Sequence, residues 1–524
     1  MQDFKTALKN IKMKRMTKFI WVLFICLIST SGCDKGFEKV NTNPVLPTSL
    51  DPSYLFADAQ LTSAIYTIQY QAEIVQQIIT PFTGVLEGGN HNVWFFANNV
   101  GSAFTSLYTG PVKLLTNVLH QTKDDPSRSN LYNMARIWRC HVFQVLVDTY
   151  GYVPYFTAGA AYLEGINLPK YDSDEEIYDD LLKELVDATN KLDAGKKIES
   201  NDLFYKGNIS KWKKLGNSLL LRVAMRFTKV NPDKAKQYVT LATDMSRGGL
   251  IESNSDNAFV PFNSVFNHPN ASTFQGSERA NFYLAKPFVD YLKSVDDPRL
   301  KVIAVKYEIP ANPIGTAGSE DTEPQHQQGM PYGYNDATIS SEPNYPGKIG
   351  AAWKYSQLNR KTLAKIDAPE FFITHSQTQL LLAEAAQRGW ISGDPEIHYN
   401  AGVKAHMDQM LQYDQSAAIT PALQNAYLNA NPFNPADAIE QINTQYWISS
   451  FLNGSEGWAN FRRSGFPQLE PNPYPGADPV VKGDFIHRLQ YPAREISVNA
   501  ENYKDAVARM GADNMATRVF WDVK

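Results

Sequence analysis

The chain of 524 residues carries 54 acidic and 50 basic residues, a net charge of −4, and is rich in aromatic residues, with 27 Tyr, 27 Phe and 9 Trp. This acidic balance argues against a nucleic-acid-binding protein, which needs basic patches, and against electrostatic attachment to anionic lipid. The length suits one large domain or two or three of average size.

The first 32 residues have the layout of an export signal. A head with six basic residues precedes an apolar run at residues 19–28, and small residues follow the run. A charged head, a short apolar stretch and small residues are typical of a secretory signal peptide. The run is too short to cross a bilayer, which takes about 20 apolar residues. We therefore predict a signal peptide at residues 1–32.

Cys33 stands directly after this segment, and the junction resembles a bacterial lipobox, with Thr30 where Leu is usual. In that type of signal the cysteine receives lipid after cleavage. Several acyl chains hold a protein on a membrane almost permanently, because each buried methylene contributes about 0.8 kcal/mol. We predict lipidation of Cys33 and a polar tether over residues 33–50. The alternative is an ordinary secreted protein in which Cys33 is incidental.

Residues 51–250 show mostly helical periodicity. Ser173 and Glu176 have the spacing of a capping box, which marks the start of one helix. Cys140 lies in an apolar helical stretch and is interpreted as a small core residue. The predicted helices of this region cover residues 54–79, 102–121, 130–150, 173–192, 210–228 and 234–246.

Residues 251–370 differ in kind, because they are rich in Pro, Gly, Asn and Ser. The run LKVIAVKYEI is the clearest strand pattern among them. Long irregular segments in a compact protein are often functional. We therefore place the ligand surface here and in a second irregular segment at 81–101.

Helical patterns return at residues 374–388 and 395–412. Gly389 provides a left-handed stop for the first, and Asp394 with Pro395 provides the cap and first turn of the second. Small residues on both segments predict two closely packed antiparallel helices of the tetratricopeptide type. A further helix at 439–452, and a strand-like piece with a short last helix within 491–510, complete the chain. We predict one domain over 51–524, with a helical scaffold at 51–250 and 371–470.

Several ordered sequence blocks resemble the SusD/RagB family of nutrient-binding outer-membrane lipoproteins, and most closely its SusD-like 2 branch. Together with the lipobox they extend over nearly all of the chain after Cys33. The main blocks are FEKVNTNP (37–44), DTYGYVPY (148–155), LRVAMR (221–226), AEAAQRG (383–389), NGSEGW (453–458) and FRRSGFP (461–467).

The resemblance implies a mainly α fold, with tetratricopeptide-like helix pairs and an irregular region holding a few short strands. It also implies a lipoprotein at the outer membrane, facing the exterior, that covers a SusC-like TonB-dependent transporter. Such a protein captures an oligosaccharide, or in some members a peptide, and passes it to the transporter. The blocks themselves are interpreted as scaffold. Arg222 and Arg226 share a helix face and would need acidic partners, and Glu384 is predicted to form hydrogen bonds at a helix interface.

Candidate binding residues are aromatic and polar side chains in the two irregular segments, because a flat ring meets the apolar face of a sugar and polar groups meet its hydroxyls. The alternative is that these aromatic side chains fix the loops to the core, and the same set would also suit a peptide. The candidates are His91, Asn92, Trp94 and Phe95 in the first segment, and Tyr332, Tyr334, Asn335, Tyr345, Trp353 and Tyr355 in the second.

The sequence lacks the His-Glu-x-x-His, Cys-x-x-Cys, Gly-x-Ser-x-Gly and phosphate-loop motifs. We therefore predict a binding protein that is not an enzyme and has no cofactor or catalytic metal. Two alternatives stay open. A lipid-anchored glycoside hydrolase needs only two carboxylates at the right distance, which no motif reveals. A helical scaffold protein would bind only other proteins.

Overall fold

The computed structural model of the chain describes residues 50–66, 70–82 and 101–523. The predicted signal peptide, the lipidation site Cys33 and residues 83–100 lie outside these ranges. By their contacts, residues Pro52–Lys524 form one unit. Among the described residues, no helix is both long and apolar enough to span a bilayer.

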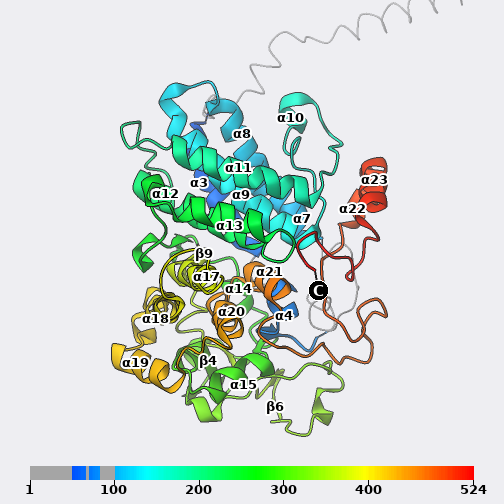
Figure 1. The fold of residues 1–524 in the computed structure, drawn as a ribbon. Coiled ribbons are helices and arrows are strands. Elements are labelled where there is room, and N and C mark those ends of the chain that lie inside the picture. The colour runs from blue at the N-terminus through cyan, green and yellow to red at the C-terminus, as the bar shows by residue number, and fades with distance from the viewer. Residues whose placement is uncertain (1–49, 67–69, 83–100, 524) are drawn as a thin grey trace, which may run out of the picture. The chain divides into compact units, whose positions relative to one another are not determined.

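The unit is mainly helical, as predicted, and its first half is a layer of helices (Figure 1). The helix α11 packs between α9 and α12, and α13 packs on α12. The capping box at Ser173 and Glu176 is present, with the Ser173 side chain accepting a hydrogen bond from the Glu176 backbone N–H. The helices of this half are α3 (Pro52–Thr62), α4 (Tyr70–Ile74), α7 (Ser102–Leu107), α8 (Lys113–Thr122), α9 (Ser129–Tyr150), α10 (Ala161–Glu164), α11 (Asp174–Lys191), α12 (Ile209–Met225) and α13 (Pro232–Thr243).

A second group of helices follows the irregular region. The predicted pair is confirmed as α17 and α18, which pack along each other. Gly402 permits this approach, because a Cβ there would stand 2.7 Å from Leu380 Cγ. Ser376 Oγ also donates to the Gly402 carbonyl at 2.7 Å. The later helices are α17 (His375–Gln387), α18 (Pro395–Tyr413), α19 (Pro421–Ala430), α20 (Ala438–Ser449), α21 (Gly454–Ser464), α22 (Ala493–Val498) and α23 (Ala500–Met510).

The irregular region at 251–370 holds three short helices and most of the short antiparallel strands, and its sheets also include β1 from the first half of the chain. Its sheets pair β1 with β3, β2 with β9 and β6 with β7, and order β5-β4-β8 in a three-stranded sheet. The elements are β1 (Ile78–Ile79), β2 (Ala258–Val260), α14 (Ala271–Gln275), β3 (Tyr283–Leu284), α15 (Lys286–Ser294), α16 (Arg299–Ile303), β4 (Ala304–Tyr307), β5 (Glu320–Asp321), β6 (Lys348–Ile349), β7 (Ala352–Trp353), β8 (Gln357–Leu358) and β9 (Glu370–Ile373).

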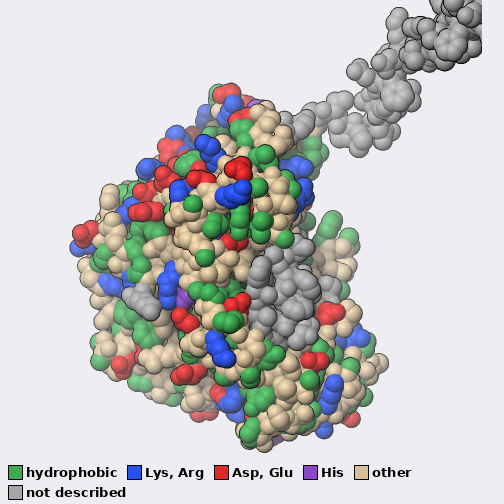
Figure 2. Space-filling view, turned by 90° about the vertical axis from the view of Figure 1, so that its right-hand side faces the viewer, with side chains coloured by type: hydrophobic (Ala, Val, Ile, Leu, Met, Phe, Trp, Pro, Cys, Tyr) green, Lys and Arg blue, Asp and Glu red, His purple; other side chains and the backbone are tan. Residues whose placement is uncertain are grey.

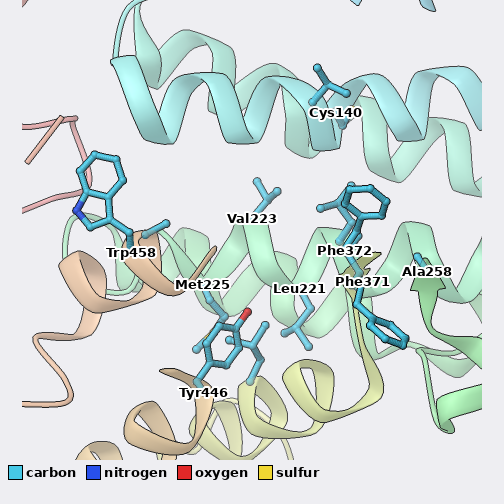
Figure 3. Packing of buried hydrophobic residues seen from close by; sticks show 14 of the residues in the cluster. Cys140, Leu221, Val223, Met225, Ala258, Phe371, Phe372, Tyr446 and Trp458 are labelled. Atoms are coloured by element: carbon cyan, nitrogen blue, oxygen red, sulfur yellow. The ribbon is translucent and has the colours of Figure 1, made fainter. Parts of the chain in front are cut away.

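One large hydrophobic core joins both helical groups. Leu221 and Val223 of α12 lie near Phe371 and Phe372 of β9 (Figure 3), and all four are buried. Cys140 belongs to this core with 2% of its surface exposed, which confirms the prediction for it. Burial raises the pKa of the Cys140 thiol well above its usual value, so it is an unreactive packing residue.

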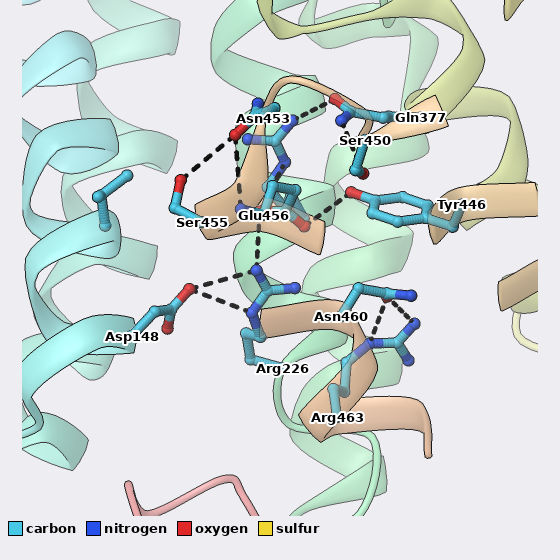
Figure 4. A network of polar contacts seen from close by, with 12 residues as sticks. Asp148, Arg226, Gln377, Tyr446, Ser450, Asn453, Ser455, Glu456, Asn460 and Arg463 are labelled. Carbon is cyan, nitrogen blue, oxygen red and sulfur yellow. Dashed lines mark hydrogen bonds and ion pairs between the residues drawn. The ribbon is translucent and has the colours of Figure 1, made fainter. Parts of the chain in front are cut away.

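Ion pairs cross the interior of the helical layers (Figure 4). Arg226 Nη2 contacts Glu456 Oε2 at 2.8 Å and Asp148 Oδ2 at 3.2 Å, so α12 is joined to α21 and α9. Arg222 Nε lies 3.6 Å from the same Glu456 oxygen, and its Nη2 donates to Gln377 Oε1 at 2.6 Å. The prediction that these arginines are structural and need acidic partners is thereby confirmed.

A second buried pair joins α17 to α21. Arg463 Nη2 lies 2.7 Å from Glu384 Oε2, and both side chains are 1% exposed. Burial raises the pKa of Glu384, but the guanidinium groups of Arg463 and Arg388 outweigh it and lower that pKa to about 2. Glu384 is therefore an ionised helix-interface residue.

Three sequence predictions need correction. The helix predicted at 54–79 ends at Thr62, and the described part of the remainder holds only short turns, α4 and β1. The strand predicted from LKVIAVKYEI is half helix, because α16 occupies its first residues and β4 begins at Ala304. The strand-like piece within 491–510 is helical, as α22, whereas the short last helix predicted there is confirmed as α23. Such short apolar runs fit either structure by periodicity alone, and neighbouring contacts decide between them.

Candidate ligand-binding face

A second, smaller hydrophobic cluster lies apart from the main core, and we call it the aromatic cluster. It combines β1, β3 and β7 with the loops between α15 and β8, so it draws on both irregular segments of the sequence. Its buried members are Ile79, Tyr283, Ala285, Met330, Tyr332, Ile339, Trp353 and Tyr355, and Phe82, Tyr334 and Tyr345 pack against them.

Trp353 occupies the middle of the aromatic cluster and is 1% exposed. Phe82 meets its ring edge to face at a centroid distance of 5.1 Å, and Tyr283 does so at 6.0 Å. The Lys348 ammonium lies 4.3 Å from the ring centroid. Lys348 lies on strand β6, which pairs with β7, and its side chain is exposed. Replacing the ammonium at the indole by another group should therefore cost little free energy.

The tyrosines of the aromatic cluster attach the second irregular segment to the first. The Tyr332 hydroxyl lies 2.7 Å from the Glu73 carbonyl oxygen and 3.0 Å from that of Ile78, and it donates to them. Tyr355 is 1% exposed, and its hydroxyl lies 3.5 Å from Glu342 Oε2. Burial and then the Glu342 carboxylate raise the pKa of Tyr355, so this hydroxyl stays protonated.

A buried acid lies beneath the cluster. Glu73 is fully buried, and among the described residues no hydrogen bond of ordinary geometry reaches its carboxyl oxygens. Burial raises the pKa of Glu73 well above its usual value, although the Thr80 backbone opposes the shift. Glu73 is therefore a neutral acid at pH values where exposed carboxyls are charged.

These positions correct the expectation of open aromatic platforms. Tyr332, Trp353 and Tyr355 are buried, while Tyr334, Asn335 and Tyr345 are half-buried. Composition could not show this, because a loop with few apolar residues uses its aromatic side chains to build a small core of its own. The predicted residues of the first segment, His91, Asn92, Trp94 and Phe95, lie outside the described residues.

Two hollows flank the aromatic cluster, and Tyr355 lines both. One has a volume of about 170 Å³ and the other about 350 Å³. Polar side chains in their linings offer carboxylates, amides and ammonium groups suited to hydroxyl-rich ligands. Sequence reasoning missed these lining residues, since they come from separate elements and form no motif. They include Lys286, Asp290, Gln328, Glu342 and Asn344 in the smaller hollow, and Lys306, Glu308 and Lys354 in the larger.

On the face shown in Figure 2, the acidic and basic side chains of the described residues are interspersed and form no large patch of one charge. No group of three or more His, Cys, Asp or Glu side chains that could hold a metal ion occurs in the described part of the chain. The groups present in the aromatic cluster and its two hollows are rings, amides, carboxylates and ammonium groups.

Comparison with known proteins places these features in context. The family model SusD-like 2, described as starch-binding and associating with the outer membrane, matches residues 44–492. No curated protein matches the sequence.

Solved structures give a consistent result. A chitin-binding protein is 30% identical, with a TM-score of 0.78 over 90% of this chain and 100% of its own. A Bacteroidetes SusD-like protein is 27% identical, with a TM-score of 0.78 over 91% of this chain and 100% of its own. A chitin-binding SusD homologue from Flavobacterium johnsoniae is 22% identical, with a TM-score of 0.72 over 90% and 98%, and shows the shared fold.

Proposed function

The chain belongs to the SusD-like family, and from this premise we propose that it is a cell-surface lipoprotein that captures an oligosaccharide for a SusC-like TonB-dependent transporter. Its lipid anchor would be Cys33, and it would bind its ligand without turning it over. The observation that carries the proposal is the likeness to a chitin-binding protein over 90% of the chain. That likeness favours an oligosaccharide of acetylated amino sugars over a peptide.

The face around the aromatic cluster supports this proposal. Its two hollows meet at Tyr355. Phe82, the last described residue before the predicted site residues His91–Phe95, packs on Trp353. A sugar needs both ring stacking and hydroxyl partners. We propose that Trp94 and its neighbours supply the stacking surface, and that Glu342, Asn344 and Tyr355 contribute on the other side.

Calorimetry with chitohexaose, maltohexaose and a neutral hexapeptide tests the ligand class. We expect chitohexaose to bind, and Trp94→Ala to weaken it about tenfold, which corresponds to 1.4 kcal/mol. Trp390→Ala is the matched control, since Trp390 stacks on Arg388 away from the cluster. Tighter binding of the hexapeptide would replace the oligosaccharide by a peptide, and shortened sugars after incubation would indicate a hydrolase.

The lipid anchor at Cys33 and the association with a transporter are tested separately. Cys33→Ala should release the protein from the membrane fraction, and pelleting that persists would contradict lipidation at this position. A transporter encoded beside this gene should co-purify with the wild-type protein. Purification of the protein alone from cross-linked membranes would contradict the partnership.

A further inference from the structure

A pocket of about 430 Å³ shares no lining residue with the aromatic cluster or with its two hollows. Its walls come from α7 and the turn after it, from the loop between α9 and α11, and from α22. The volume falls in the range typical of small-molecule sites, roughly 300–1,000 Å³.

The lining of this pocket is predominantly apolar. Phe104, Pro154, Ile166, Leu168 and Val498 form much of it. Leu168 and Val498 are 53% and 51% exposed, so large apolar surfaces face the solvent at the opening. Of the two hollows beside Tyr355, the smaller has a mainly polar lining, with Lys286, Asp290 and Glu342 among its residues.

The walls are held in place by hydrogen bonds that do not involve a ligand. The Tyr108 hydroxyl donates to the Pro154 carbonyl. On the opposite side, Asn499 Nδ2 donates to the Pro169 carbonyl at 2.9 Å, and Asn502 Nδ2 donates to that of Leu168 at 3.0 Å. The pocket is therefore formed in advance, which reduces the entropy lost on binding.

One wall also departs from regular helix. Residues Tyr108–Val112 form a π-helical turn between α7 and α8, with Gly110 outside helical geometry and Pro111 within it. Such turns interrupt an α-helix at a cost in hydrogen bonding and are frequent at functional sites. Here the turn brings Tyr108 and Thr109 into the pocket lining.

The charges at the pocket define its ligand. Lys113, Arg494 and Glu495 are the charged side chains among its described lining residues. The Glu495 carboxylate accepts a hydrogen bond from the Tyr171 hydroxyl at 2.6 Å. The exposed side chains of Lys113 and Arg494 form no hydrogen bond or ion pair with a described residue, although the backbones of both residues are hydrogen-bonded. The pocket therefore offers two unpaired cations beside an apolar surface.

We propose that this pocket binds a small amphiphilic carboxylic acid, with its apolar body between Ile166 and Val498 and its carboxylate at Lys113 and Arg494. A single negative charge on the ligand would balance the net positive charge of the lining. This inference is independent of the proposed oligosaccharide site.

Calorimetry of the full chain with octanoate tests the proposal, with octylammonium and 1-octanol as probes of matched length. We expect octanoate to bind, 1-octanol to bind at least tenfold more weakly, and octylammonium not to bind. Arg494→Gln should weaken octanoate binding and leave 1-octanol unchanged. Lys504→Gln is its control, because Lys504 pairs with Glu501 at an exposed site outside the lining.

A second pair of variants tests the apolar part. Val498→Asp should abolish octanoate binding, whereas Ile496→Asp should not, because Ile496 lies on the same helix outside the described lining. Both residues are exposed, so both variants should melt like the wild type. Equal octanoate binding in the two variants, or equal binding of octanoate and octylammonium, would overturn the proposal. Chitohexaose affinity should be unchanged in both, which separates this outcome from that of the proposed function.

Discussion

The helical layers and the aromatic cluster both bury polar groups, but they satisfy them differently. Between helices, charged partners such as Arg226 and Glu456 form pairs that are 0% and 5% exposed. In the aromatic cluster, neutral hydroxyls such as that of Tyr332 donate to backbone carbonyls. A buried ion pair demands both partners in one geometry, whereas a neutral hydrogen bond costs less to rearrange. We therefore call the helical layers with their buried ion pairs the frame, and expect its side chains to keep one arrangement. The side chains of the aromatic cluster beside the proposed ligand site should change their arrangement at a lower cost in free energy.

The largest expected effect tests the fixed frame. Glu384→Gln leaves Arg463 without its ionised partner, and we expect a loss of about 3–5 kcal/mol in the free energy of unfolding, measured with urea. Because the folded pKa of Glu384 is about 2, the loss should be complete above the unfolded pKa and shrink as the pH falls towards 2.

The matched control removes an exposed pair. Lys504→Gln breaks an ion pair whose side chains are 70% and 88% exposed, so it should change stability by about 0.5 kcal/mol or less. If Glu384→Gln lowers the free energy of unfolding no more than this control does, buried ion pairs do not hold the helical layers more firmly than neutral hydrogen bonds hold the aromatic cluster.

A moderate effect tests the neutral hydrogen bonds. Tyr332→Phe removes the hydroxyl that reaches the carbonyls of Glu73 and Ile78, and we expect a loss of about 1–2 kcal/mol on urea unfolding. Tyr132→Phe is the control, since the Tyr132 hydroxyl has no partner among the described residues while its ring meets Arg136. If Tyr332→Phe lowers the free energy of unfolding as much as Glu384→Gln does, the aromatic cluster is as costly to rearrange as the frame.

Glu73 offers a test in which the sign depends on pH. Because the folded pKa of Glu73 is raised, the folded state retains a proton that the unfolded state releases, and stability falls as the pH rises above the unfolded pKa. Glu73→Gln should therefore raise the melting temperature relative to the wild type at pH 7, and the gain should decrease towards pH 4. A gain that is the same at both pH values would show that ionisation is not its cause.

The smallest expected effect concerns the cover of Trp353. Lys348→Gln removes the ammonium above the indole, and we expect a stability change below about 1 kcal/mol, because Phe82 and Tyr283 still pack on the ring. Tryptophan fluorescence during unfolding measures it. If the fluorescence of Lys348→Gln without denaturant already differs from that of the folded wild type, Lys348 is essential to the aromatic cluster.

The frame could be predicted from sequence because helices encode it locally. Ser173 with Glu176 gave the start of α11, and Asp394 with Pro395 gave the start of α18, as observed. The acidic partners of Arg222 and Arg226 were expected, but their identity was not, since Asp148 and Glu456 lie far away in the sequence and only folding brings them together.

The candidate site was predicted only in part. Tyr332, Trp353 and Tyr355 do meet in one cluster, and their burial agrees with the alternative that such side chains fix the loops to the core. The sequence could not choose between the two, because irregular segments have no period that separates inside from outside. The polar lining of the hollows, such as Asp290 on α15, had no sequence pattern at all. The apolar pocket also escaped, since its walls are distant segments whose individual residues are ordinary.

One contact in the frame constrains how the protein can be made. Trp521 Nε1 donates to Asp148 Oδ1 at 3.1 Å, across 373 residues of sequence. Asp174 likewise accepts from the Phe520 backbone N–H at 2.8 Å. A nascent chain that has not yet reached these last residues holds both carboxylates without their final donors. The helix α9 and the start of α11 therefore gain these two hydrogen bonds only when residues 520 and 521 have folded against them.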